Sequence, residues 1–207
     1  MANPRAYPPK LFLKKWEEFS GPLPDGPFAN DLELVNARIA QEDALKDFAQ
    51  QQPFPPEELA KLRQQRASGG QEHEVFVPLK GRRGSRVWKV TRPDRWGLIR
   101  ATPLEYARRL DRFDQLSGTH VLIEGIAIDQ NLPLLVTTMD FILGDHPEGQ
   151  TIHNRLLAEG WETAPDPDGM MSYRHKIDRT LMRDAHPKNF ILTAGGLLVP
   201  IDVIFMP

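Results

Sequence analysis

The chain of 207 residues contains no cysteine. This absence excludes disulfide bonds, thiolate zinc sites and cysteine nucleophiles, and it is compatible with a reducing cytosol. The chain also lacks any apolar run close to the roughly 18 residues of a membrane-spanning helix. Its start, Met1 to Pro9, has no apolar core of the kind found in secretory signals. We therefore expect a soluble, cytoplasmic protein without a membrane partner. Export as an effector stays open, because dedicated export systems read signals that need not be apolar.

An excess of charge of either sign is missing as well. Lysine and arginine number 26, aspartate and glutamate 28, and the net charge is −2. Because a basic surface is typical of nucleic-acid binders, the charge balance indicates no nucleic-acid partner. The six histidines form no close metal-binding pattern, and no serine-nucleophile motif is present. We interpret His73 as a polar partner in the core and His186 as a loop-orienting residue.

The pattern of apolar residues changes at Gly69 and Gly70, which predicts an N-terminal helical extension over residues 1–70 and a second domain over residues 71–207. The expected helices of the extension cover Leu11 to Phe19, Asp31 to Gln52 and Pro56 to Arg66. The apolar face of the longest one is predicted from Leu34, Val35, Ile39, Leu45 and Phe48. We expect these helices to pack on the second domain as one cooperative unit and to cover the apolar residues of its last hairpin.

From residue 71 the chain is expected to alternate between short strands and helices. The predicted order is a hairpin, a helix, a hairpin, a connector, a helix, a polar loop and a final hairpin. The corresponding segments are 74–79 and 86–91, 102–115, 120–128 and 132–138, 139–143, 151–159, 164–169, and 189–193 with 197–201.

Three polar residues near the carboxyl end have the spacing of a phosphoryl-transfer site. Asn189 follows Asp184 by five positions, and Asp202 follows Asn189 by thirteen. In such a site the first aspartate orients or deprotonates the acceptor hydroxyl, and the asparagine and later aspartate offer oxygen ligands to magnesium. The final hairpin would carry one metal ligand at each end. The alternative is a polar loop with a turn-forming aspartate and an asparagine cap.

At these residues the chain resembles the protein kinase and aminoglycoside phosphotransferase superfamily, whose catalytic loop reads H-[RG]-D-x-x-x-x-N. The match includes Arg183, which precedes the aspartate. The chain is similar to the very short kinase-like domains in polyvalent proteins of bacterial mobile elements. Their recurring features are found here as Glu72-His73, Lys89, Thr102 to Tyr106, and Asp184 to Asn189. The resemblance covers about residues 70 to 207.

The resemblance implies an α+β fold: a minimal two-lobed protein-kinase-like domain with a truncated C-lobe, here with an N-terminal helical extension. It implies ATP and Mg²⁺ as cofactors, with Asp184 as the catalytic base and Asn189 and Asp202 as metal ligands. The acceptor would be a hydroxyl group of a protein or of a small molecule. The sequence does not identify it, and the oligomeric state is equally undetermined.

Lys89 lies in the middle of the strand 86–91, where a kinase places the lysine that contacts the nucleotide phosphates. Alternation of side chains puts Val87 and Lys89 on one face and Trp88 and Val90 on the other. The alternative is a lysine on the solvated face of an edge strand.

Glu105 is the expected partner of Lys89, as the helix glutamate is in the family. The competing interpretation is local, because Thr102-x-x-Glu105 is a capping box, in which the glutamate binds the amide of its own N-cap residue. Asp111 and Asp114 are the alternative partners of the lysine.

Further nucleotide contacts are expected from the loop 80–85, through Gly81 and Gly84, and from the connector that begins at Met139. The glycine amides would face phosphate oxygens, and the connector backbone would bind adenine. Lys188 is a further phosphate contact because it lies within the catalytic loop. An ordinary exposed hairpin turn is the alternative for the loop 80–85.

Several positions depart from the family pattern. Met182 replaces the histidine, and Val203 and Ile204 replace the phenylalanine and glycine that usually follow the metal aspartate. We expect no activation segment or large helical lobe after Asp202. Two other functions therefore stay open: a nucleotide-binding pseudokinase or interaction module, and a nucleotidyltransferase built on the kinase fold.

Overall fold

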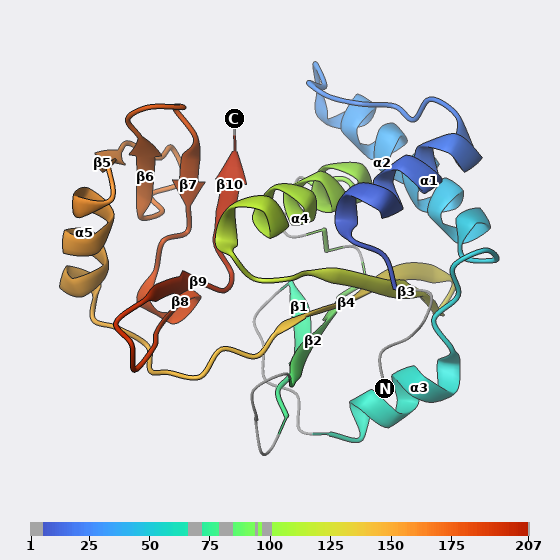
Figure 1. Ribbon diagram of the computed structural model, residues 1–207. Coiled ribbons are helices and arrows are strands. Elements are labelled where there is room, and N and C mark those ends of the chain that lie inside the picture. The colour runs from blue at the N-terminus through green and yellow to red at the C-terminus, as the bar shows by residue number, and fades with distance from the viewer. Residues whose placement is uncertain (1–5, 66–71, 79–84, 94, 97–100, 207) are drawn as a thin grey trace. The chain divides into compact units, whose positions relative to one another are not determined.

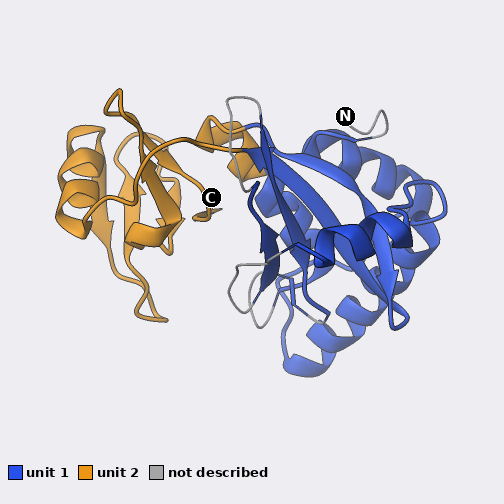
Figure 2. Cartoon of the chain, turned by 90° about the horizontal axis from the view of Figure 1, so that it is seen from below, with its two compact units in different colours: residues 1–81, 85–111, 120–140 blue, residues 82–84, 112–119, 141–207 orange. Residues whose placement is uncertain are grey.

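The computed structural model describes residues 6–65, 72–78, 85–93, 95–96 and 101–206 (Figure 1). Helices and antiparallel strands occur together, which confirms the α+β class. The chain divides into two compact units (Figure 2). Unit 1 comprises residues 1–81, 85–111 and 120–140, and unit 2 comprises residues 82–84, 112–119 and 141–207.

Unit 1 contains a four-stranded antiparallel sheet in the order β1-β2-β4-β3, with helices on both faces. Its elements are α1 (Pro9–Ser20), α2 (Asp31–Phe48), α3 (Pro56–Arg63), β1 (His73–Phe76), β2 (Arg86–Thr91), α4 (Pro103–Ser117), β3 (Leu122–Asp129) and β4 (Leu132–Asp140). The end of α4, from Arg112 onward, belongs to unit 2. Gln130 and Asn131 join β3 to β4 with φ values of 48° and 63°, as a tight two-residue turn requires.

The sheet of unit 1 has a hydrophobic core on each face. On one face, α1, α2 and α4 cover the strands (Figure 1). This core contains Phe12, Trp16, Leu45, Phe48, Leu104, Tyr106, Ile123, Ile126 and Leu135. On the other face, α3 packs over the strands through Leu59 and Leu62, beside Val90 and Leu134. The N-terminal helices therefore share both cores with the sheet, and the division of the chain into units does not fall near residue 70.

These helices were expected to pack on the part of the chain that follows residue 70, and the structure shows them packed on the sheet of unit 1. The last hairpin, which they were also expected to cover, belongs to unit 2. Within unit 2, Gly144 and Asp145 run along the hairpin: Asp145 and Leu192 exchange backbone hydrogen bonds of 2.8 and 3.1 Å. A Cβ on Gly144 would lie 2.3 Å from the Leu192 carbonyl oxygen, so only glycine fits there.

The apolar face predicted for α2 is also partly wrong. Val35 and Ile39 are 49% and 53% exposed, whereas Gln41 and Glu42 are buried beside Leu45. The two polar side chains are buried because they bind neighbouring segments. Gln41 Nε2 donates to the Pro24 carbonyl at 2.5 Å and its Oε1 accepts from the Leu104 amide at 2.8 Å, while Glu42 accepts from Trp96 Nε1 at 2.8 Å. Hydrogen bonding thus outweighs apolar periodicity in the choice of buried face.

Unit 2 contains a second antiparallel sheet, in the order β10-β7-β6-β5, and the separate hairpin β8-β9. Its elements are α5 (Gly149–Ala158), β5 (Trp161–Ala164), β6 (Ser172–His175), β7 (Leu181–Arg183), the short 3-10 helix η1 (Pro187–Asn189), β8 (Phe190–Leu192), β9 (Leu198–Pro200) and β10 (Ile204–Met206). β5, β6, β7 and β10 were not predicted, and the predicted polar loop begins only after Ala164, the last residue of β5. These strands have three or four residues each, too few to establish an alternating pattern.

No helix within the described ranges is long and apolar enough to cross a membrane.

Candidate functional site

The loop predicted to carry the chemistry follows β7 directly and is held by a series of local hydrogen bonds. Asp184 has a φ of 55°, a left-handed conformation that turns the chain sharply after the strand. The Ala185 amide donates to the Met171 carbonyl at 2.8 Å, which fixes the turn to the preceding segment. His186 Nδ1 accepts from the Lys188 amide at 3.3 Å, so its predicted role in orienting the loop is confirmed.

Asn189 closes this loop onto Asp184. Its Nδ2 group donates to the Asp184 carbonyl oxygen and to Asp184 Oδ2, both at 2.8 Å. Because these two bonds use both amide hydrogens, Asn189 Oδ1 is the atom left to accept a donor or bind a cation. The asparagine thus closes the loop, as the alternative interpretation expected, and still presents an oxygen.

The hairpin predicted between Asn189 and Asp202 is present. β8 pairs with β9, with Ile191 opposite Val199. The Ile201 amide donates to the Asn189 carbonyl at 2.8 Å, which holds the two ends of the hairpin together. Asp202 follows β9 and is exposed. Asn189 and Asp202 therefore stand at the open end of the hairpin, beside Asp184.

The electrostatics of Asp184 reflect this arrangement. Burial raises the pKa of the Asp184 carboxyl above its ordinary value, and the nearby Asp202 carboxylate raises it further. The hydrogen bond from Asn189 and the charges of His186 and Arg183 act in the opposite direction. Two mutually repelling carboxylates and an amide oxygen are a set of hard oxygen donors of the kind that Mg²⁺ prefers. Among the described residues, no group of three His, Cys, Asp or Glu side chains forms a metal site by itself.

Arg183, immediately before Asp184, is held in an ionic cluster with the buried Asp166 side chain and the exposed Asp168 side chain, which was not predicted. Its Nε and Nη2 donate to the two carboxylate oxygens of Asp166 at 2.6 and 3.0 Å, and Nη2 also donates to Asp168 at 2.6 Å. Ser172 Oγ donates to Asp166 at 2.8 Å. The guanidinium holds the pKa of Asp166 well below its ordinary value, with help from Ser172 and the Asp168 amide. This cluster fixes the residue before the candidate base to the loop between β5 and β6.

Lys89 lies in unit 1 on β2, which has β1 on one side and β4 on the other. The edge-strand alternative is therefore wrong. Lys89 is opposite Val75 on β1 and Thr137 on β4, and it is partly buried. Trp88 points to the opposite face and packs on Phe54 with ring centroids 6.0 Å apart, so the predicted alternation is confirmed.

The face that carries Lys89 is the one covered by α4. His73 shares this face by strand register, because Val75 pairs with Lys89 and His73 with Thr91. The His73 ring is buried and lies 2.8 Å from the Tyr106 hydroxyl of α4, measured from Nε2. His73 is thus a polar core residue, as predicted.

Glu105 forms the capping box. Its Oε2 accepts from the Thr102 amide at 2.8 Å, and the Glu105 amide donates to Thr102 Oγ1 at 3.3 Å. The structure therefore shows the local interpretation of Glu105. Of the alternative partners for Lys89, Asp111 belongs to unit 1 and Asp114 to unit 2.

The remaining residues predicted to contact the nucleotide do not all belong to one unit. Met139 is buried near the end of β4, opposite Val87, and the chain passes from unit 1 to unit 2 after Asp140. Lys188 is exposed in η1. Gly81 and Gly84 lie outside the described residues.

A second unanticipated network fixes the end of β4 where this connector begins. Arg86 donates to Asp140 at 2.9 Å, to Thr138 Oγ1 at 2.8 Å and to the His120 carbonyl at 2.6 Å. Thr138 Oγ1 in turn donates to the buried carboxylate of Glu124 at 2.7 Å. No local pattern in the sequence signals these contacts, because the partners are 14 to 54 positions apart.

Comparisons of the chain with known proteins found no matching family model, no similar curated protein and no matching solved structure.

Proposed function

We propose that this chain is an ATP- and Mg²⁺-dependent phosphotransferase with a minimal kinase-like fold, which transfers the γ-phosphoryl group to a hydroxyl acceptor. The observation that carries the proposal is the meeting of Asp184, Asn189 and Asp202 at one end of the hairpin. Asn189 bonds to Asp184, and Asp202 lies close enough to raise the Asp184 pKa. A loop that served only as a connection would not require a second carboxylate close enough to oppose the ionisation of the first.

Each residue has a defined part in this chemistry. Asp184 accepts the proton of the acceptor hydroxyl while the new oxygen–phosphorus bond forms and the bond to the ADP oxygen breaks. Its raised pKa makes the carboxylate a stronger base than an ordinary aspartate. Asn189 Oδ1 and the Asp202 carboxylate would hold magnesium, which supplies positive charge against the phosphate oxygens when bound.

Unit 1 supports the same proposal through Lys89. A lysine on an inner strand, partly buried and on a helix-covered face, is held more rigidly than one on an edge strand. Rigid placement favours contact with the nucleotide phosphates, since a preorganised charge loses little entropy on binding. The order hairpin, helix, hairpin and connector is the order expected of the nucleotide-binding lobe, and the connector backbone from Met139 would bind adenine.

A second candidate function is a nucleotide-binding pseudokinase or interaction module. The observation in its favour is the capping box, which uses one Glu105 carboxylate oxygen to bind the Thr102 amide. The departures from the kinase pattern at Met182, Val203 and Ile204 also favour this second candidate. Nucleotidyl transfer is the third candidate, since it uses the same residue types with the nucleotide reversed.

Incubation of the whole chain with Mg²⁺ and ATP separates the three candidates. One reaction carries the label on the γ-phosphate and a parallel one carries it on the α-phosphate, each with the chain alone and with cell lysate. Transfer of the γ-label that is lost in Asp184→Asn supports phosphotransfer. Transfer of the α-label supports nucleotidyl transfer, and nucleotide binding without transfer of either label supports the pseudokinase. The mass shift of the modified acceptor identifies the transferred group independently.

A further inference from the structure

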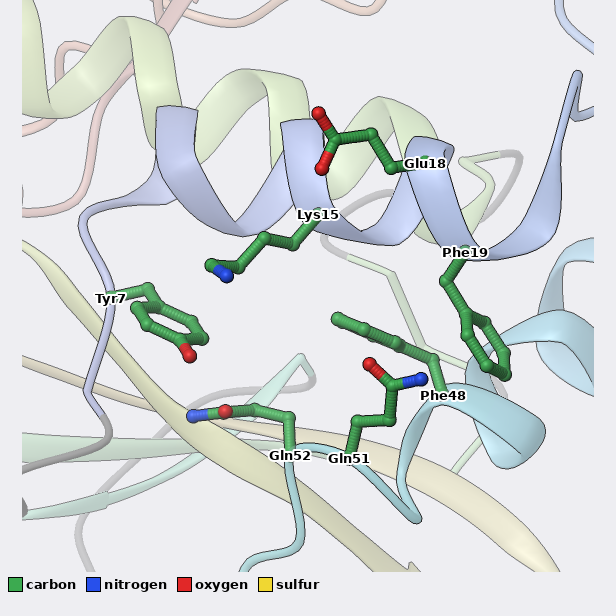
Figure 3. Close-up of a pocket in the computed structure, with 7 residues that line it drawn as sticks. All are labelled: Tyr7, Lys15, Glu18, Phe19, Phe48, Gln51 and Gln52. Atoms are coloured by element: carbon green, nitrogen blue, oxygen red, sulfur yellow. The ribbon is translucent and has the colours of Figure 1, made fainter.

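Unit 1 contains a cavity of about 420 Å³ between α1, the end of α2 and the segment at Tyr7 (Figure 3). None of the candidate phosphotransfer residues lines it. Two of the segments that line it, at Tyr7 and at Gln52, are hydrogen-bonded to strand β3 of the sheet. Tyr7 exchanges backbone hydrogen bonds of 2.8 and 3.0 Å with Ile123, and the Gln52 carbonyl accepts from the Ile126 amide at 2.9 Å. The cavity is therefore formed by well-anchored backbone, and its volume falls in the range of small-ligand sites.

Aromatic rings form one side of the cavity. Phe48 is buried, whereas Phe19 is 43% exposed, and their ring centroids are 5.5 Å apart. Figure 3 shows the Phe48 ring edge-on between Lys15 and the Gln51 amide, with Phe19 beside it. Flat aromatic surfaces of this kind favour a planar ligand that stacks or packs edge to face.

The charge inside the cavity comes from Lys15. Its ammonium lies 5.2 Å from the Tyr7 ring centroid, a cation–π distance, and no ion pair to Lys15 occurs in the described part of the chain. The neighbouring Lys14 pairs instead with Glu18 at 3.7 Å. In Figure 3 the Glu18 carboxylate points away from the other lining side chains, whereas Lys15 extends between α1 and Tyr7. The cavity is thus lined by one cation, Lys15, and by one carboxylate, Glu18, whose charge is paired with Lys14.

We propose that this cavity binds a small planar anion: a single flat ring that carries one carboxylate or phosphate group. Lys15 binds the anionic group, and the exposed face of Phe19 and the edge of Phe48 contact the ring. The Gln51 side-chain amide, which offers both a donor and an acceptor, bonds to polar atoms at the ring edge. A carboxylate and a phosphate share the chemistry that Lys15 recognises, and the two sources are separated by experiment.

The test uses the full chain and two probes, nicotinate for the carboxylate and uridine 5′-monophosphate for the phosphate. Nicotinamide and uridine are their uncharged counterparts. Binding is followed through the NMR shifts of the Lys15 backbone amide and the Gln51 side-chain amide, which report on this cavity and not on a nucleotide site elsewhere. We expect saturable shifts with at least one charged probe and affinity lower by about tenfold or more for its uncharged counterpart.

The matched variants are Lys15→Met, which removes the charge but keeps most of the length of the side chain, and Lys14→Met on the preceding residue. Lys15→Met should weaken binding of the charged probe by about tenfold, and Lys14→Met should leave it unchanged. Binding of nicotinate alone, of the nucleotide alone, or of both identifies the source of the anion. The proposal is overturned if neither probe shifts these signals at millimolar concentration, if the uncharged probes bind as tightly, or if Lys15→Met binds like the wild type. The comparison of charged and uncharged probes needs no variant, so it decides the question even if Lys15→Met does not fold.

Discussion

At Asp184, burial and a second carboxylate both oppose ionisation, while the Asn189 amide supports it. The native protein therefore holds the Asp184 proton more tightly than the unfolded chain does. Because the pKa of Asp184 is raised in the folded protein, the free energy of unfolding falls as the pH rises from the ordinary pKa of 3.8 through the folded pKa. Above that window the ionised carboxylate costs stability, and this cost is expected at a site shaped for function and not for folding.

The variant Asp184→Asn tests the role of this charge. Asparagine keeps the shape and can still accept the hydrogen bond from Asn189, so nucleotide binding should persist and stability at neutral pH should equal or exceed that of the wild type. Transfer should fall by about two to four powers of ten, because the proposed proton acceptor is gone. Chemical denaturation and a transfer assay measure the two effects. Equal losses of binding and transfer would instead assign Asp184 a structural or metal role.

Asp202→Ala removes the second carboxylate of the site. Asp202 is exposed, so the fold should remain intact and thermal unfolding should change little. Transfer should be abolished, because the variant lacks a proposed metal ligand. The pKa of Asp184 should also fall, since the Asp202 charge no longer raises it. An NMR titration of the Asp184 carboxyl carbon checks the shift, and wild-type turnover would contradict the assignment.

At the level of residues, the sequence predicted those functional candidates whose spacing along the chain is short. Asp184, Asn189 and Asp202 are joined by one loop and one hairpin, so their approach follows from local structure. Glu105 could not be decided, because the same Thr102-x-x-Glu105 pattern describes a helix cap and a lysine partner. The ion pair of Arg183 with Asp166 was not predicted, because Asp166 lies in the turn between β5 and β6 and Arg183 ends β7, and none of these strands was predicted.

Among the elements, β7 and the loop after it depend on the Arg183 cluster for their position. Because the Asp166 pKa is held below its ordinary value of 3.8, the unfolded chain binds more protons than the native one in the window below 3.8. The stabilisation from this pair is therefore complete above that window and is lost as the pH falls through the folded pKa.

The variant Asp166→Asn should have a lower free energy of unfolding than the wild type at neutral pH. Its free energy of unfolding should also fall less steeply than that of the wild type as the pH is lowered. Asp178, whose pKa is lowered chiefly by the Thr180 amide, keeps part of that acid dependence. The matched control is Asp168→Asn, because the Asp168 side chain is 62% exposed and makes the weaker contribution. Denaturant unfolding at several pH values measures both variants. Identical pH profiles for Asp166→Asn and the wild type would contradict the role of the pair.

Most helices and the longer strands could be predicted because each shows its own periodicity over several turns or alternations. The buried face of α2 could not, because Gln41 and Glu42 are buried by partners far away in the sequence. The short strands of the second sheet could not be predicted for a related reason. For example, Leu181 to Arg183 forms a strand only through its pairing with β6 and β10.

For the molecule as a whole, the N-terminal helices are part of the fold of unit 1. A chain beginning at Gly70 would expose Ile123, Ile126 and Leu135, because their partners on α1 and α2 would be missing. Each large side chain lost from this core removes about 1.5–3 kcal/mol of burial, and the sum is comparable with a domain stability of about 5–15 kcal/mol. We expect that fragment to aggregate or to unfold without cooperativity. A soluble fragment with a cooperative melting transition would contradict this account.

Two leucines of α2 give a milder test of the same claim. Leu45 is fully buried and Leu32 is 69% exposed. Leu45→Ala should cost about 2–5 kcal/mol of unfolding free energy, whereas Leu32→Ala should cost about 0.5 kcal/mol or less. Denaturant unfolding of the full chain compares them directly, and equal effects of the two substitutions would show that α2 is not integrated in the core.

Two lobes joined by a connector over residues 139–143 were expected, and the chain divides into its two units after Asp140, the residue at which β4 ends. Composition alone placed the boundary at Gly69-Gly70, because glycine pairs often mark linkers. The core contacts show no boundary at that position, since residues from the N-terminal segment contribute to both hydrophobic cores of unit 1.

Calorimetric titration of the full chain with ATP, with magnesium and with a chelator, tests the central claim most directly. The wild type should bind ATP in the presence of Mg²⁺, and removal of Mg²⁺ should weaken binding by about tenfold or more. Asp202→Ala should bind ATP equally with and without the metal, whereas Glu159→Ala, which removes an exposed acid of the same unit, should behave like the wild type. Absence of ATP binding, or an affinity of the wild type that does not depend on Mg²⁺, would contradict the proposed phosphotransfer site.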